Sequence, residues 1–324
     1  MQTSSMRADQ PLGEAGAALV AERLKKAEKR LKPASKGDPE GIHDLRVAIR
    51  KIRAAISVLD ETILDDGNGG ALRKQDRRLS RLFSALGDVR DHDVLSKRIA
   101  ATARRRRLRR KGLRVLVRTL EERGEKARRT LRKVRRRHEP AALFARMRHE
   151  VARAVADARP KRDDHRVLVR HFAASVLLRR YEAVLAYELV VPASVDVLHR
   201  LRVAIKKLRY AVDFFAEVLG ERAAELDRPL QTAQDRLGEL HDHHVERLLV
   251  ADVERRHGSG RTLAALRNAD DTEAERLLAA FERSWKEISQ GRVARTLALA
   301  TRELLGPHAA RRSTLALRRA ESAH

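Results

Sequence analysis

HDLRVAIRKIR at residues 43–53 and HRLRVAIKKLR at residues 199–209 carry the same basic motif twice in a chain of 324 residues. The two stretches are identical at eight of eleven positions. Of the three exchanges, an Arg for a Lys and an Ile for a Leu are conservative, and the third replaces Asp44 by Arg200. A basic motif that is present twice indicates that the two copies act together.

Helical geometry places the charged residues of each copy on one side of a helix. At about 100° per residue, they fall within an arc of about 80°, opposite an apolar stripe. Within the two motifs no acidic i,i+4 partner relieves the repulsion between these cations, and each copy begins with a histidine near a helix N-terminus, where the helix dipole disfavours positive charge. A bound anion would relieve both costs, so the pattern predicts an anion site of the phosphate type. The basic faces comprise His43, Arg46, Arg50 and Arg53 in the first copy and His199, Arg202, Lys206 and Arg209 in the second.

A second pair of motifs follows the first pair in the same order. LGDVRDHDVL at residues 86–95 resembles LGELHDHHVE at residues 237–246. Repetition of both motifs in one order predicts a duplicated helical bundle with an internal pseudo-two-fold axis. We expect the two basic helices to face each other, with His43 and His199 lining one shared basic cavity. Asp91 and Asp242 then either orient an Arg or His of the basic faces or form surface ion pairs.

The composition favours an all-α protein that binds a polyanion. Apolar residues make up 43% of the chain, enough for a core, and aromatic residues only 3%. Ala, Leu, Arg and Glu dominate, which favours helices over strands. The net charge of +26 repels itself in a compact state unless an anion compensates it. The absence of cysteine excludes disulfides, thiol catalysis and thiolate metal sites.

Helix breakers divide the chain into segments. Asp38 is a good helix N-cap followed by Pro39 at the first helical position. Further breaks are expected at Asp65–Gly70, Pro140 and Pro160, and Gly220 is expected to end a helix. The pattern predicts about four long helices in each half. We expect a first half over about 15–138, a second half over about 165–290, and a C-terminal extension over 291–324.

These motifs resemble the conserved-histidine α-helical domain (CHAD) family over residues 15–290. The resemblance implies two four-helix bundles related by a pseudo-two-fold axis around a basic central cavity. It also implies binding of inorganic polyphosphate and association with polyphosphate granules. The binding residues it implies are His43, Arg46, Arg50, Lys51, Arg53, His199, Arg202, Lys206, Lys207, Arg209 and Tyr210, with Arg78, Arg81 and Arg90 of the following helix as additional candidates. The only departure from the family pattern in these motifs is Arg200, which stands in the second copy where the first copy has Asp44.

Catalysis and metal binding are the weaker interpretations. CHAD domains are often joined to a CYTH-type triphosphatase, but EERGEK at 121–126 does not match its Glu-x-Glu-x-Lys signature and no other stretch does. No pair of carboxylates or nucleophile–base pair accompanies the basic motifs, so we expect a binding module and not an enzyme. HDHH at 241–244 suggests a metal site, yet i,i+2 spacing on a helix separates the side chains, and metal ligands must converge. We therefore expect neither a metal nor another cofactor.

Nucleic acid remains the alternative ligand. RRRRLRRK at 104–111 and RRTLRKVRRRH at 128–138 are dense enough in charge to hold a phosphate backbone, or they are solvated outer faces. The scarcity of aromatic residues removes the stacking platforms that single strands require. The sequence shows no secretory signal and no apolar run that could span a bilayer, so we expect a cytoplasmic protein that does not bind membranes.

Overall fold

The computed structural model describes residues 6–60, 70–157, 167–188, 194–258 and 260–321. Within these ranges the chain forms twelve helices and no strand, which confirms the prediction of an all-α fold. The first group comprises α1 (Leu12–Lys29), α2 (Leu31–Ser35), α3 (Pro39–Asp60), α4 (Gly70–Arg105), α5 (Arg110–His138) and α6 (Pro140–Asp157). The second group comprises α7 (Val169–Leu185), α8 (Val195–Phe214), α9 (Ala216–Leu219), α10 (Glu221–His257), α11 (Arg261–Ser289) and α12 (Arg292–Glu321).

Local sequence explains where several helices begin and end. Asp38 caps α3 as predicted, because its carboxylate accepts the Gly41 N–H at 2.8 Å and Pro39 occupies the first position of the helix. Gly220 ends α9 with a φ of 55°, in the left-handed region that glycine adopts without strain. The predicted turn at Asp65–Gly70 lies outside the described residues except for Gly70, and Pro160 lies outside them as well.

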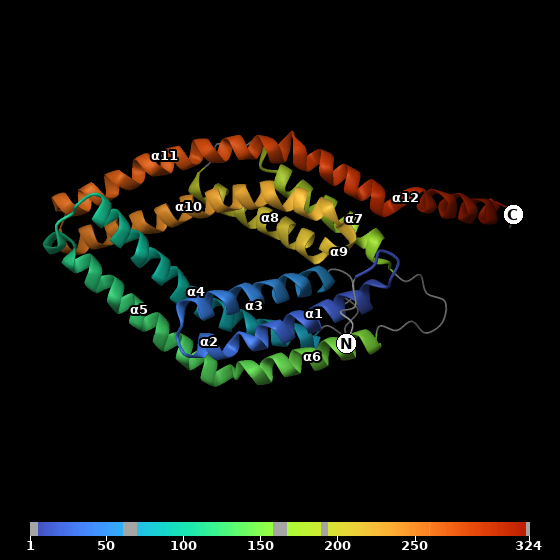
Figure 1. The fold of residues 1–324 in the computed structure, drawn as a ribbon, viewed down its shortest axis with the longest axis horizontal. Coiled ribbons are helices and arrows are strands. Elements are labelled where there is room, and N and C mark those ends of the chain that lie inside the picture. The colour runs from blue at the N-terminus through green and yellow to red at the C-terminus, as the bar shows by residue number, and fades with distance from the viewer. Residues whose placement is uncertain (1–5, 61–69, 158–166, 189–193, 259, 322–324) are drawn as a thin grey trace.

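The helices of each group pack mainly among themselves (Figure 1). In the first group α3 contacts α1, α2 and α4, and α6 contacts α1 and α4. In the second group α8 contacts α7 and α10, and α12 contacts α7, α10 and α11. Each group holds five long helices and one short helix, one long helix more than the pattern predicted. The additional helix of the first group is α6, which starts at Pro140, the residue we expected to mark a break.

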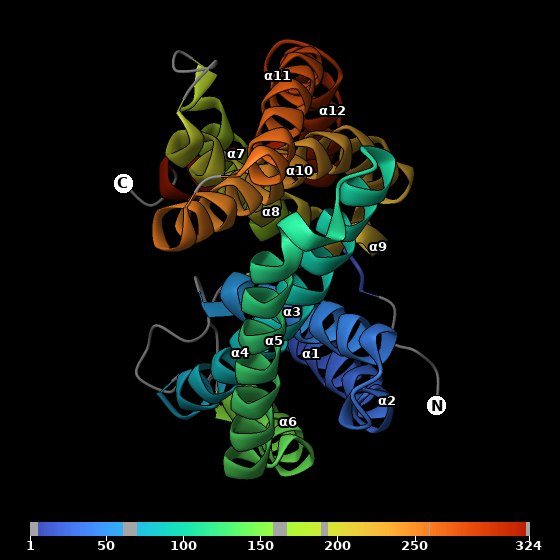
Figure 2. The ribbon, with the colours of Figure 1, turned by 90° about the vertical axis from the view of Figure 1, so that its left-hand side faces the viewer.

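The two groups meet in two places. Near the middle of the molecule α3 contacts α8 and α1 contacts α7. There the apolar stripes of both motif helices, including the fully buried Ile49 and Ile205, belong to one continuous core. At the far ends of α4, α5, α10 and α11 a second apolar cluster joins the groups, with Leu116, Val250 and Leu266 at its centre. Figure 2 views the molecule from this end, where α5 faces the reader.

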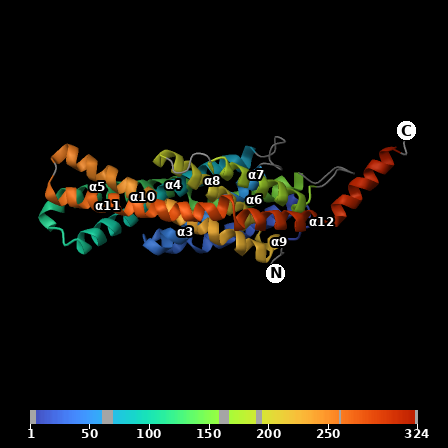
Figure 3. The ribbon, with the colours of Figure 1, turned by 90° about the horizontal axis from the view of Figure 1, so that it is seen from above.

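The C-terminal region contributes to the core. The extension expected over 291–324 begins as α12, in which Val293, Leu297 and Ala300 are buried in the main cluster. α12 bends at Gly306, whose φ is 46°, and its last part leads away from the other helices (Figure 3). The packed part of the chain thus extends past residue 290, because α12 covers α7 and α10. No helix of the described ranges has the length and apolar character needed to cross a bilayer.

Candidate functional site: a pocket between the two helix groups

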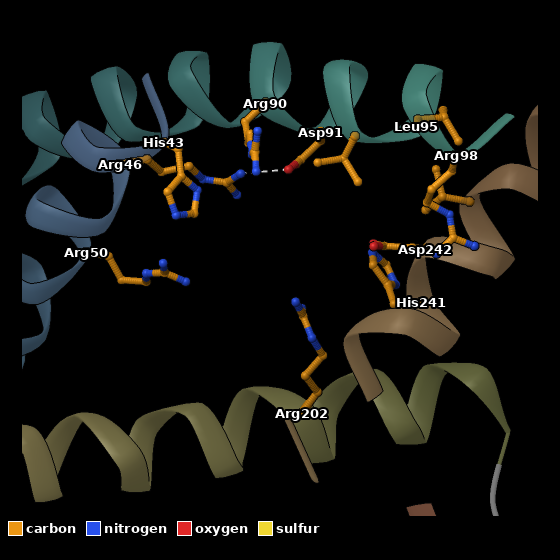
Figure 4. A pocket seen from close by; sticks show the side chains of 12 residues that line it. His43, Arg46, Arg50, Arg90, Asp91, Leu95, Arg98, Arg202, His241 and Asp242 are labelled. Atoms are coloured by element: carbon orange, nitrogen blue, oxygen red, sulfur yellow. Dashed lines mark hydrogen bonds and ion pairs between the residues drawn. The ribbon is translucent and has the colours of Figure 1, made fainter. Parts of the chain in front are cut away.

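A pocket of about 380 Å³ lies where the two groups face each other. Helices α3 and α4 supply one wall, and α8 and α10 supply the other. Figure 4 shows side chains from both walls pointing into the same space. The pocket is lined by His43, Arg46, Arg50, Arg90, Asp91, Val94, Leu95, Arg98, Arg202, His241, Asp242 and Val245.

The Leu-Gly pair of the second motif makes room for an arginine of the first. Arg46 donates from Nη1 to Asp91 Oδ1 at 2.7 Å, and its guanidinium lies 5.3 Å from the centre of the Phe83 ring. A Cβ atom at Gly87 would lie 3.4 Å from Arg46 Nη2. A larger side chain at this position would therefore displace the guanidinium. The repeat in the sequence identified Gly87 as part of a motif, but it did not show that this glycine leaves room for Arg46.

The second group repeats this arrangement, but with an arginine that is less fully hydrogen-bonded. A Cβ atom at Gly238 would lie 3.6 Å from Arg202 Nε, so Arg202 also rests against a glycine of the next long helix. Within the described part of the chain, Arg202 Nε is buried and has no hydrogen-bond partner. Buried donors without a partner are costly, so this guanidinium is suited to bind an external acceptor.

Cations of both motif helices lie close together where α3 packs on α8. Burial, and after it the positive charges of Arg202 and Arg50, lower the pKa of Lys206 from 10.5 to about 8. Burial also raises the pKa of Tyr210, an effect that the charge of Arg50 opposes. The Tyr210 hydroxyl is buried beside Arg50, but the geometry falls short of a hydrogen bond. This crowding of positive charge costs stability in the free protein, and an anion would relieve it.

The two histidines of the pocket favour the neutral state. Burial lowers the pKa of His43, and the nearby Arg90 lowers it further. Burial lowers the pKa of His241 as well, with Arg202 as the next cause. A neutral imidazole can donate one hydrogen bond, and an anion beside it would favour protonation.

Arg98 and His241 line the pocket although sequence reasoning did not select them. His241 occupies the position of Arg90 in the second Leu-Gly motif, which was the available signal. Arg98 lies 3.4 Å from the fully buried Glu246, a contact between α4 and α10. Asp242 shares this wall, and burial raises the pKa of its carboxyl group. Arg98 has no basic counterpart in the second motif, so only the tertiary structure reveals it.

Nine of the predicted binding residues, Lys206 and Tyr210 among them, do not line the pocket. Four of the nine are engaged by other groups or point to solvent. Arg53 forms two hydrogen bonds to Asp76, at 3.0 and 3.4 Å, and Arg209 forms two to Asp227, at 2.9 and 3.3 Å. Both arginines therefore attach a motif helix to the following long helix. Of the two lysines, Lys51 pairs with Asp213 at 2.7 Å and Lys207 is exposed.

Three further predicted residues point elsewhere. The ring of His199 lies 5.0 Å from that of His241, outside the pocket, so the two motif histidines do not line one common cavity. Arg78 and Arg81 lie close enough to His138 to lower its pKa, although burial is the larger cause. They belong to the side of α4 that faces the end of α5. In the described ranges no cluster of three or more His, Asp or Glu is arranged to hold a metal ion.

The chain belongs to the CHAD family, because the family model of the CHAD domain matches residues 18–251. The fold is similar to the crystal structure of the CHAD domain from the plant Ricinus communis, with 21% identity, a TM-score of 0.62, and coverage of 93% of this chain and 94% of that chain. It is also similar to PptA from Streptomyces chartreusis, with 19% identity, a TM-score of 0.64, and coverage of 86% and 100%. At these identities the likeness concerns the fold. A comparison with curated protein sequences finds no match.

Proposed function

We propose that this member of the CHAD family binds inorganic polyphosphate in the pocket between α3, α4, α8 and α10. The observation that carries the proposal is the convergence of charge from both helix groups. Five arginines and two aspartates line the pocket. Lys206 lies close enough to several of these arginines for their positive charge to lower its pKa. Guanidinium groups bind phosphate oxygens in pairs, so the lining suits a ligand of repeated oxyanions.

The lining also argues against a nucleotide in this pocket. Besides the two histidines, the residues that line it include no aromatic ring on which a base could stack. Val94, Leu95 and Val245 form its apolar part. A chain of phosphates without bases matches this combination better than a nucleic acid does.

In this proposal the protein holds polyphosphate and does not cleave it. Asp91 is engaged by Arg46, and burial raises the pKa of the Asp242 carboxyl. In this proposal Asp91 therefore orients Arg46, one of the two roles that the sequence left open, and Asp242 lies close enough to Arg98 and Arg202 to interact with their charges. A protein that binds along the polyphosphate chain without cleaving it would associate with polyphosphate granules in the cytoplasm.

The proposal is tested by removing four pocket charges. We expect Gln at Arg46, Arg50, Arg90 and Arg202 to lower polyphosphate affinity by about 100-fold or more, because each lost contact also reduces counterion release. Affinity is measured by titration calorimetry with long-chain polyphosphate across a series of salt concentrations, and the salt dependence should become shallower in the variant.

A matched control carries Gln at the exposed Arg228, Arg283, Arg292 and Arg295 of α10, α11 and α12. Its net charge equals that of the pocket variant, but its pocket is intact. Equal losses of affinity in the two variants would show that polyphosphate binds a diffuse positive surface and would refute the pocket as the site. Release of inorganic phosphate during incubation would contradict the binding-only role.

A further inference from the structure

The outer face of α5 carries a row of cations that the pocket does not use. We define the α5 ridge as the five exposed residues Arg129, Arg132, Lys133, Arg136 and Arg137. Their spacing of three and four residues places them on one face of the helix. None of them lines the pocket between the helix groups.

The ridge differs from the rest of α5 in having no acidic partners. Arg118 pairs with Glu122 at 3.0 Å, and Arg128 pairs with Asp93 at 2.8 Å. In the described ranges no carboxylate forms an ion pair with any of the five ridge residues. Neighbouring cations without compensation destabilise a helix, so the ridge is costly unless it binds an anion.

The fold does not require this row of charge. α11 packs on α10 as α5 packs on α4, yet the exposed positions of α11 include acids as well as bases. Glu275 and Arg276 are adjacent and exposed there, and so are Lys286 and Glu287. A helix in the equivalent position of the second group thus keeps a mixed surface, which means that packing alone does not explain the ridge.

The charge continues from α5 onto α4. His138, the last residue of α5, is buried, and the positive charges of Arg81, Arg137 and Arg78 lower its pKa further than burial alone. The exposed Arg81 therefore lies beside the end of the ridge. This position explains two arginines that the sequence assigned to the pocket and that the structure places outside it.

The surroundings of the ridge select the kind of polyanion. Leu131 is buried and Val134 is partly buried against the core, so the part of α5 that carries the ridge has no free apolar face with which to enter a membrane interface. The ridge contains no aromatic residue for stacking single-stranded bases. An exposed, convex row of charge holds a flexible polymer poorly, because ordering the polymer costs entropy. A duplex is already stiff over a length of about 50 nm and avoids that cost.

We propose that the α5 ridge is a second polyanion site, which binds the phosphodiester backbone of duplex nucleic acid independently of sequence. Rows of cations about 5–6 Å apart along a helix can contact several successive phosphates of one strand. The proposal does not depend on polyphosphate binding in the pocket. The protein would then hold polyphosphate and nucleic acid on separate surfaces.

The test compares two variants of equal charge. The ridge variant carries Gln at all five ridge residues, and the control carries Gln at Arg228, Arg283, Lys286, Arg292 and Arg295, which are also four arginines and one lysine at exposed positions. Binding of a short mixed-sequence duplex, as DNA and as RNA, is followed by fluorescence anisotropy. We expect the ridge variant to lose about 100-fold or more in duplex affinity and its salt slope to fall by about 4, whereas the control stays near wild type.

Retained polyphosphate affinity in the ridge variant shows that it is folded and that the two sites are separate. Equal loss of duplex binding in both variants would overturn the proposal, because binding would then depend on total charge. Loss of polyphosphate binding with unchanged duplex binding would assign the ridge to polyphosphate and would also overturn it. Unchanged duplex binding in both variants would also overturn the proposal.

Discussion

Replacement of Lys206 by Met should make the free protein more stable while weakening its binding of polyphosphate. The pKa of Lys206 falls from 10.5 to about 8, chiefly by burial and then by the charges of Arg202 and Arg50. This difference of about 2.5 pH units corresponds to about 3.5 kcal/mol at about 1.4 kcal/mol per unit. Lys206 is only partly buried, so screening by solvent reduces the expected gain to about 2 kcal/mol.

The pKa of Lys206 is lower in the folded protein than in the unfolded protein, and this direction determines how the stability depends on pH. Below pH 8 the amine is protonated in both the folded and the unfolded protein, so the full cost of the buried charge is present. Between about pH 8 and pH 10.5 the unfolded state binds more protons, and the stability of the wild-type protein therefore rises with pH. The stability difference between Lys206→Met and wild type should be largest below pH 8 and should disappear near pH 10.5.

Urea denaturation followed by circular dichroism at several pH values measures this difference. Lys207→Met is the matched control, because Lys207 is exposed on the same helix and its replacement should change the free energy of unfolding by less than about 0.5 kcal/mol. Polyphosphate affinity of Lys206→Met should fall by about tenfold, the effect of one lost cation. A variant that is no more stable than wild type at pH 7, or a difference that persists unchanged to pH 10.5, would refute the reasoning.

Substitutions at two further positions separate binding from stability. Gly238→Ala should retain polyphosphate affinity and gain up to about 1 kcal/mol of helix stability, since its Cβ would lie 3.6 Å from Arg202 Nε in ordinary contact. Gly238→Leu should displace the Arg202 guanidinium and reduce affinity about tenfold, as one lost phosphate contact would; calorimetric titration that finds equal affinity for both variants would contradict the role of the glycine. Arg209→Ala should lower the free energy of unfolding by about 2 kcal/mol, because it removes the paired hydrogen bonds to Asp227. Its polyphosphate affinity should stay close to wild type, and a loss as large as that of Arg202→Ala would return Arg209 to the binding site.

The sequence by itself determined where most helices lie and which side of each motif helix is buried. Apolar residues at helical spacing predicted that Ile49 and Ile205 would be buried, and both are. Asp38 predicted the start of α3. These predictions succeed because capping and amphipathic periodicity depend on residues within a few positions of each other. The extra helix α6 was missed because its proline was interpreted as a break, although proline is favoured at a first helical position.

Only the tertiary structure decided which basic residues meet. The sequence placed Arg50 and Arg53 on the same face of one helix, yet Arg50 lines the pocket and Arg53 is held by Asp76. Likewise, His43 faces the pocket, whereas His199 turns to His241. The partner of each side chain lies on another helix, tens of residues away or more, and helical periodicity carries no information about how helices are positioned against one another. The sequence thus determines that this protein carries two cationic helix faces, and the packing of α4 and α10 against them determines which cations remain available to a ligand.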